Sequence, residues 1–215
     1  VSSTTASMSI YSSPSNGEKV KHLDCELHLA DPETWVHEWD RQAYLIKRSI
    51  SYLEQRAAQG LDSMLSTGMI YKMFASLVDY EDGFKGLQEA ILHSEELEGT
   101  AKVRFRTPKG GFHCNPMWID SCGQTTGFLM NCHQTTPNDY VYVNHGWKSM
   151  RLAKQFREDA TYRTYIRMRS IDGTKYAGDL YILDEADDVM GVYGDITVSF
   201  HFNVDIMTSG DINPQ

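Results

Sequence analysis

Hydrophobic and polar residues alternate along several stretches of the chain, and a period of two predicts β-strands. In residues 23–29 every second side chain is apolar and those between are polar, so we expect a strand with one buried face. Similar patterns predict further strands at residues 87–92, 100–106, 140–143, 147–152, 162–169, 176–183, 189–193 and 196–204. Asp172-Gly173 between two of these stretches is typical of a hairpin, which favours antiparallel pairing.

Other stretches repeat apolar residues every three or four positions, which predicts amphipathic helices. The first begins at Asp31-Pro32, where aspartate can cap the helix and proline suits its first position. We expect this helix to end near Gly60, and a short second helix to cover residues 69–77.

A further helix is predicted over residues 115–131, beginning at Asn115-Pro116. Gly123 and Gly127 lie on one face of it, which predicts that another part of the chain packs very close to that face. Antiparallel strands around one close-packed helix indicate an α+β fold of the hot-dog type.

The composition narrows the class of protein. The 215 residues are 41% hydrophobic and carry a net charge of −9, which argues against a nucleic-acid-binding surface. No apolar run is long enough to span a membrane. Four cysteines without a CxxC pair and no secretory signal predict reduced thiols in a cytoplasmic protein. We expect a flexible Ser/Thr-rich linker at residues 1–18, one domain at 19–206 and a tail at 207–215.

Asp120 and Gln124 are the main chemical candidates. They are four residues apart on the central helix, so the carboxylate and the amide point the same way. Trp118 and other apolar neighbours place them beside a buried environment, where an ionised aspartate needs a partner. The pair is interpreted either as a catalytic carboxylate with a substrate-binding amide or as a polar pair on a hydrated helix surface.

Asn144-His145-Gly146 is a second candidate, because a break between two strands could direct polar side chains into a pocket. An ordinary turn or bulge explains the same residues. The remaining histidines lack the spacing of metal ligands, and no nucleotide-binding or nucleophile-elbow motif occurs. The sequence therefore predicts no metal and no directly bound cofactor.

Several motifs together resemble the product template domain of fungal non-reducing polyketide synthases. The central one comprises residues 115–121 (NPMWIDS), Gly123-Gln124 and residues 127–131 (GFLMN). The others follow in the family's order at residues 35–46 (WVHEWDRQAYLI), 76–80 (SLVDY), 142–147 (YVNHGW), 178–181 (GDLY) and 191–194 (GVYG).

The resemblance implies a double hot-dog fold related to the dehydratases of fatty acid synthases. It implies aldol cyclisation and aromatisation of a poly-β-keto chain carried on the phosphopantetheine of an acyl carrier protein. A histidine base from the first hot dog and an aspartate from the second form the family's catalytic dyad. Asp120 matches that aspartate, Gln124 matches a neighbouring polar position, and Asn144 falls in a motif that lines the pocket, with Trp118 and His145 as further substrate contacts.

This sequence also departs from the family pattern. Every matching motif belongs to the second hot dog, and no histidine stands in the context of the catalytic base. Met117 replaces an aromatic residue, and residues 199–215 differ from the usual closing segment. We therefore expect the C-terminal half of a product-template unit, inactive by itself, that needs an N-terminal hot-dog half and an acyl carrier protein. Because carrier proteins are acidic, docking would use a local basic patch such as Arg104-Arg106 or Arg163-Arg167.

Two alternatives stay open from the sequence. One is a dehydratase that eliminates water from a β-hydroxyacyl thioester. The other is a non-catalytic hot dog that binds acyl chains or forms a homodimer.

Overall fold

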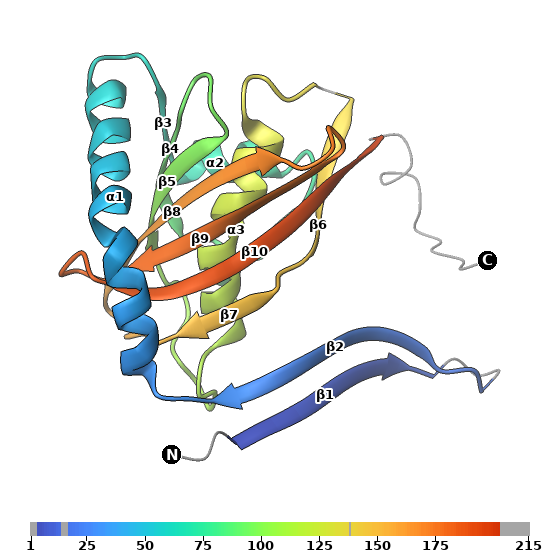
Figure 1. The fold of residues 1–215 in the computed structure, drawn as a ribbon. Helices are drawn as coiled ribbons and strands as arrows, with labels where there is room; N and C mark the ends of the chain where they lie inside the picture. The colour runs from blue at the N-terminus through green and yellow to red at the C-terminus, as the bar shows by residue number, and fades with distance from the viewer. Residues whose placement is uncertain (1–3, 14–16, 138, 203–215) are drawn as a thin grey trace.

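The chain folds into one curled antiparallel sheet with a helix on each face, beside a separate two-stranded ribbon (Figure 1). The computed structural model describes residues 4–13, 17–137 and 139–202. Its helical elements are α1 (Pro32–Ala58), α2 (Thr67–Phe74), the 3₁₀ turn η1 (Asp82–Phe84) and α3 (Pro116–Cys132). Its strands are β1 (Thr4–Ser12), β2 (Val20–Leu29), β3 (Ser63–Ser66), β4 (Leu87–Leu92), β5 (Glu98–Arg104), β6 (Tyr140–Gly146), β7 (Ser149–Leu152), β8 (Thr161–Ser170), β9 (Lys175–Leu183) and β10 (Val189–Phe202).

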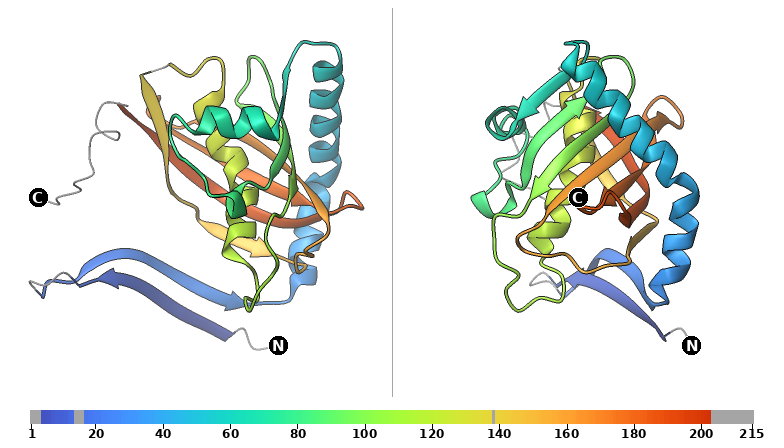
Figure 2. Two further views of the ribbon diagram at one scale, coloured as in Figure 1. Left: turned by 180° about the vertical axis from the view of Figure 1, so that it is seen from behind. Right: turned by 90° about the vertical axis from the view of Figure 1, so that its left-hand side faces the viewer.

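The large sheet has the strand order β3-β4-β5-β8-β9-β10-β6, and β7 pairs with β10 beside β6. All these pairs are antiparallel. The sheet curls around α3, which lies in its concave side, whereas α1 covers the convex side (Figure 2). This arrangement confirms the predicted α+β hot-dog fold.

A separate hydrophobic cluster lies on each face of the sheet. On the concave side, Trp118, Cys122 and Phe128 of α3 pack among the inward-facing side chains of the strands. On the convex side, α1 buries its apolar stripe against the opposite side chains of the same strands. The stripe consists of Trp39, Ile46, Ile50 and Leu53. The central strands therefore bury side chains on both faces, and α3 is held between the sheet and the segment that carries α2.

Both long helices begin where their capping residues predict. The side chain of Asp31 accepts a hydrogen bond from the backbone N–H of Glu33, and that of Asn115 accepts one from Met117. A proline follows each cap, because the first helical position needs no N–H donor. The first helix ends at Ala58, and Gly60 adopts a positive φ of 72°, close to the predicted end.

The predicted flexible linker at residues 1–18 is wrong for residues 4–12, which form β1. Ala6, Met8 and Ile10 pair with Leu27, Cys25 and Leu23 of β2 and lie on the same face of the ribbon. The serine and threonine residues around them make this alternation hard to recognise in the sequence. Backbone pairing with β2 stabilises the strand. The second strand was expected to bury one face, but the ribbon stands apart from the sheet and Leu27 and Leu29 stay exposed.

Three further observations concern the strands. Of the turn or bulge expected at residues 144–146, the structure has the bulge: β6 continues through Gly146, and a register shift at Thr197/Val198 of β10 leaves His145 as the extra residue. The two strands expected at 189–193 and 196–204 are one strand, β10, which is bulged where Asp195 has a φ of 53°. The four-residue β3 was not predicted. The tail expected at residues 207–215 lies outside the described residues.

The close approach expected at the helix glycines occurs elsewhere. A Cβ added at Gly123 or Gly127 would meet only ordinary contacts, 3.6 Å from Tyr193 and 3.8 Å from Phe74. A Cβ added at Gly86, in contrast, would lie 2.6 Å from Ser121 of α3. The tight contact with the helix is therefore made by the segment between η1 and β4.

Candidate functional site

Asp120 and Gln124 form a hydrogen-bonded pair on α3. Nε2 of Gln124 donates to Oδ2 of Asp120 over 2.7 Å, and it also donates to the carbonyl oxygen of Phe84 over 2.8 Å. Gln124 is only 4% exposed, whereas Asp120 lies on the exposed side of the helix. The pair therefore combines a fixed, buried amide with a carboxylate that another molecule or segment can reach.

A tyrosine from α2 completes the environment of the amide. The hydroxyl of Tyr71 donates to Oε1 of Gln124 over 2.7 Å, and it accepts the backbone N–H of Leu87 over 2.9 Å. The start of β4 and the loop that precedes it thus hold the side chains of both α2 and α3. Ser121 adds a further tie, because its hydroxyl lies 3.2 Å from the carbonyl oxygen of Phe84.

Burial controls the protonation of this site. The pKa of Asp120 is raised, because neighbouring atoms remove solvent from the carboxylate, and the hydrogen bond from Gln124 opposes part of that rise. Burial raises the pKa of Tyr71, and burial together with the charge of Asp120 raises the pKa of Tyr80 to about 12. Both phenols therefore stay protonated at neutral pH, and the hydroxyl of Tyr71 remains a donor to Oε1 of Gln124.

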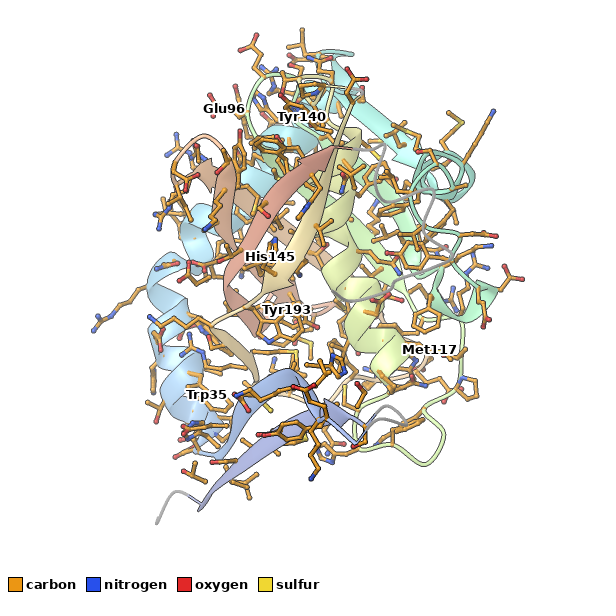
Figure 3. All side chains as sticks on the ribbon, turned by 90° about the vertical axis from the view of Figure 1, so that its right-hand side faces the viewer. Trp35, Glu96, Met117, Tyr140, His145 and Tyr193 are labelled. Carbon is orange, nitrogen blue, oxygen red and sulfur yellow. The ribbon has the colours of Figure 1, made fainter. Side chains whose placement is uncertain are left out.

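Asn144 and His145 lie on β6 and bond within their own neighbourhood. Oδ1 of Asn144 accepts the backbone N–H of Gly146 over 2.7 Å, and Nε2 of His145 contacts the hydroxyl of Ser199. The ring of His145 also stacks on His201, with the ring centres 5.7 Å apart. Figure 3 shows His145 and Tyr193 beside α3 and Met117 near the end of that helix closest to the ribbon. The role of Asn144 and His145 as substrate contacts stays a prediction.

Trp118 lies in the core beside the site. It is 1% exposed, stacks on Phe105 with ring centres 4.6 Å apart, and donates its Nε1–H to the carbonyl oxygen of Thr107. These contacts fix the first turns of α3 and hence the position of Asp120. They give Trp118 a clear packing role, while its predicted substrate contact stays a prediction.

Tyr71 was missed by the sequence analysis, although it makes the shortest contact to Oε1 of Gln124. It is 53 residues from Gln124 along the chain, and its place on the short α2 looks like an ordinary position on an apolar helix face. Tyr80, which belongs to the SLVDY motif, packs edge-on against Tyr71 at 5.9 Å. The SLVDY motif was therefore the one sequence signal near Tyr71. It marked the segment after α2 but did not indicate a contact with Gln124.

A cavity of about 670 Å³ lies on the other face of the sheet, between α1 and strands β5, β8 and β9. Gln42, Tyr52, Glu98, Tyr165 and Tyr181 are among its lining residues. Because α1 and α3 cover opposite faces, this cavity is separate from the pair Asp120–Gln124.

The described residues contain neither a metal-binding cluster nor a helix suited to span a membrane. Within residues 4–13, 17–137 and 139–202, no cluster of three or more histidine, cysteine or carboxylate side chains could hold a metal ion. In the same part of the chain, no helix is both long and apolar enough to cross a membrane.

Curated relatives are large fungal enzymes. The chain is 77% identical over 197 residues to the non-reducing polyketide synthase PKS12 of Gibberella zeae, covering 92% of this chain and 10% of that protein. It is 58% identical to polyketide synthase 2 of Metarhizium robertsii, covering 91% of this chain and 9% of that protein. The chain thus spans about a tenth of the length of these relatives.

Solved structures agree on the fold at low sequence identity. The dehydratase domain from the CurK module of curacin polyketide synthase has a TM-score of 0.62 at 12% identity, covering 94% of this chain and 64% of that one. The dehydratase domain of RzxB from Pseudomonas fluorescens has a TM-score of 0.61 at 13% identity, covering 91% and 64%. These likenesses confirm the hot-dog fold.

The family itself is given by a match over residues 53–191, more than half of the chain, to the family described as polyketide synthase dehydratase N-terminal domain. That description refers to an N-terminal domain, so the predicted placement in the second hot dog stays a prediction. The curled sheet and its central helix are consistent with this match. The chain therefore belongs to the polyketide synthase dehydratase family.

Proposed function

We propose that this chain is the C-terminal half of a product-template unit that directs aldol cyclisation and aromatisation of a poly-β-keto chain. Asp120 is the carboxylate of a histidine–aspartate dyad, and Gln124 holds it in place. The observation that carries the proposal is the Asp120–Gln124 hydrogen bond, which holds the carboxylate on the exposed side of a largely buried helix. The product-template motifs around this pair favour cyclisation over other reactions of the fold.

The chemistry needs only a modest base. A CH₂ group between two carbonyls is acidic, and a histidine near neutral pH can remove its proton. A carboxylate beside the imidazole selects the tautomer and stabilises the imidazolium that forms. The enolate then attacks a carbonyl further along the chain, and the shape of the pocket determines which two carbons meet.

The histidine is proposed to come from an N-terminal hot-dog half, and two features of this chain support such a partner. Asp120 faces outward from α3, so a base can approach it from outside this chain. The β1–β2 ribbon exposes Met8, Ile10, Leu23 and Leu27, an apolar face that a second folded half would cover. We call the chain joined to this half the completed unit.

The substrate is proposed to arrive on the phosphopantetheine of an acyl carrier protein. Of the basic patch expected to receive the carrier, Arg163 pairs with Glu54, and Arg167 lies 3.7 Å from Glu96. Carboxylates of the same chain therefore offset part of the positive charge of Arg163 and Arg167. Salt-dependent binding of the carrier would measure what remains.

A dehydratase is the second candidate, favoured by the family match and by the solved structures. Variants of the CurK dehydratase at a histidine and at an aspartate are both described as inactive. The same pair of groups would remove water from a β-hydroxyacyl thioester. Analysis of products from the completed unit decides between the two: an aromatic ring supports the proposal, and an enoyl thioester contradicts it.

The isolated 215-residue chain is expected to release no cyclised product from a carrier-bound polyketide. Its proposed dyad lacks the histidine that would take the proton from the substrate. Chromatography of products from the isolated chain and from the completed unit, at equal concentrations, measures the difference. Cyclisation by the isolated chain would mean that a base lies within it, with His145 and His22 as the first positions to change.

A further inference from the structure

The hydrogen bonds around Gln124 have only one consistent direction. The carbonyl oxygen of Phe84 can only accept, so the atom of Gln124 that lies 2.8 Å from it must be the amide nitrogen. Oε1 then faces Tyr71 and needs a donor. The phenol supplies it: its oxygen accepts the N–H of Leu87, and its one hydrogen points to Oε1 at 2.7 Å in preference to the carbonyl oxygen of Phe84 at 3.4 Å.

This direction settles which oxygen of Asp120 is available. The second N–H of Gln124 donates to Oδ2, so a proton on Oδ2 would compete with that bond. Oδ1 is therefore the oxygen of Asp120 that takes up a proton and that contacts an outside partner. A chain of hydrogen bonds thus runs from a backbone N–H, through Tyr71 and Gln124, to one chosen oxygen of the carboxylate.

We propose that Tyr71 is a positioning residue that fixes the amide of Gln124 and thereby presents Oδ1 of Asp120 to the reaction. The inference rests on the proposed function and deepens it. Without the phenol, Oε1 of Gln124 and the N–H of Leu87 lose their partner, and the bond to the carbonyl oxygen of Phe84 alone then restrains the amide beside Asp120. Because donation from Gln124 lowers the pKa of Asp120, loss of Tyr71 moves that pKa further up.

Among the described residues, no other titratable group identified near the Asp120 carboxylate changes its charge in the pH range where a carboxyl group titrates. Besides Tyr71, the titratable side chains near it lie on the segment after α2, on α3 itself and on β10; they are Tyr80, Cys122 and Tyr193. Burial raises the pKa of each, so all three stay neutral while a carboxyl group titrates. Arg106 acts on Tyr71 and stays charged throughout.

The test compares Tyr71→Phe with a matched control, Tyr162→Phe. The hydroxyl of Tyr162 likewise accepts a backbone N–H, that of Arg157 over 2.6 Å, but it has no link to Gln124. A ¹³C NMR titration of the Asp120 carboxyl in the 215-residue chain reads the pKa directly. We expect a higher pKa in Tyr71→Phe and an unchanged pKa in Tyr162→Phe.

A double-mutant cycle separates positioning from general packing. Gln124→Met is expected to raise the pKa of Asp120, and adding Tyr71→Phe to it is expected to raise the pKa no further, because both act through one amide. Should Tyr71→Phe not fold, 3-fluorotyrosine at position 71 keeps the shape and strengthens the donor, so the pKa is expected to fall. The inference would be contradicted if Tyr71→Phe left the pKa of Asp120 unchanged. It would also be contradicted if the pKa shifts of the two substitutions added up in the double variant.

Activity distinguishes this inference from the proposed function. In the completed unit, Tyr71→Phe is expected to lower kcat about tenfold and to shift the pH profile in the direction of the NMR result. Loss of product in Asp120→Asn with an unchanged profile in Tyr71→Phe overturns the positioning role alone. Full activity of Asp120→Asn overturns the proposed function, whereas the NMR titration still tests the hydrogen-bond chain.

Discussion

Replacing Asp120 by asparagine is expected to abolish cyclisation in the completed unit while leaving the fold intact. Asparagine keeps the shape of the side chain and can still accept the hydrogen bond from Gln124. It cannot stabilise an imidazolium, so we expect the rate of product formation to fall by about 10²–10⁴-fold. Chromatography of the aromatic product over time measures this loss.

Asp120→Asn is expected to lower activity but to leave the stability of the fold unchanged or to raise it. The folded state raises the pKa of Asp120, so the ionised carboxylate disfavours folding, fully above the folded pKa and not at all below the unfolded pKa. Asparagine removes this cost. Thermal unfolding is therefore expected at an equal or slightly higher temperature than wild type at neutral pH, and the difference should vanish in acid.

Asp82→Asn is the control for this experiment. Asp82 is an exposed carboxylate on the neighbouring turn η1 and pairs with Lys85 at 2.9 Å. It undergoes the same chemical change without touching Gln124, so product formation should match wild type. Loss of product in both variants, or in neither, would contradict a specific role for Asp120.

Gly86→Ala is expected to lower the free energy of unfolding by about 1–3 kcal/mol, because its methyl group has no room. The added carbon would lie 2.6 Å from both the Cβ and the hydroxyl oxygen of Ser121. The segment that carries the carbonyl of Phe84 must then move away from α3, which also loosens the anchor of Gln124. Urea unfolding of the chain measures the stability change.

Gly123→Ala is the matched control on the other side of this contact. Its new methyl group would lie 3.6 Å from the ring of Tyr193, an ordinary distance, and alanine favours the helix over glycine. Stability should stay the same or rise. A larger loss in Gly123→Ala than in Gly86→Ala would contradict the description of how α3 is packed.

Local signals in the sequence explain why the helices and the Asp120–Gln124 pair could be predicted. Caps such as Asp31 and Asn115 act within three residues, and the i, i+4 spacing of Asp120 and Gln124 fixes their common direction once the helix is known. The central strands of the large sheet, β4, β5, β8, β9 and β10, follow from alternation because they bury side chains against a helix. These parts of the structure depend on neighbours in sequence.

What could not be predicted depends on distant partners. Tyr71 reaches Gln124 only because β4 holds α2 against α3, and no pattern in either helix records that contact. β1 is stabilised by its pairing with β2, which its serine-rich composition conceals. The glycines on α3 suggested close packing, yet the close contact is made by Gly86, whose partner Ser121 is 35 positions away.

The side chain of Asn131 has a consequence for how copies of this protein meet. Its amide occupies the backbone N–H and C=O of Tyr142 on the outer edge of β6, and the opposite edge of the sheet is the four-residue β3. Within the described residues, both edges are therefore short or interrupted for a new strand. The strands of the ribbon are longer, at nine and ten residues. Strand-by-strand assembly, native or aberrant, should therefore start at the ribbon, and a proline placed at its outer edge should slow aggregation without disturbing the sheet.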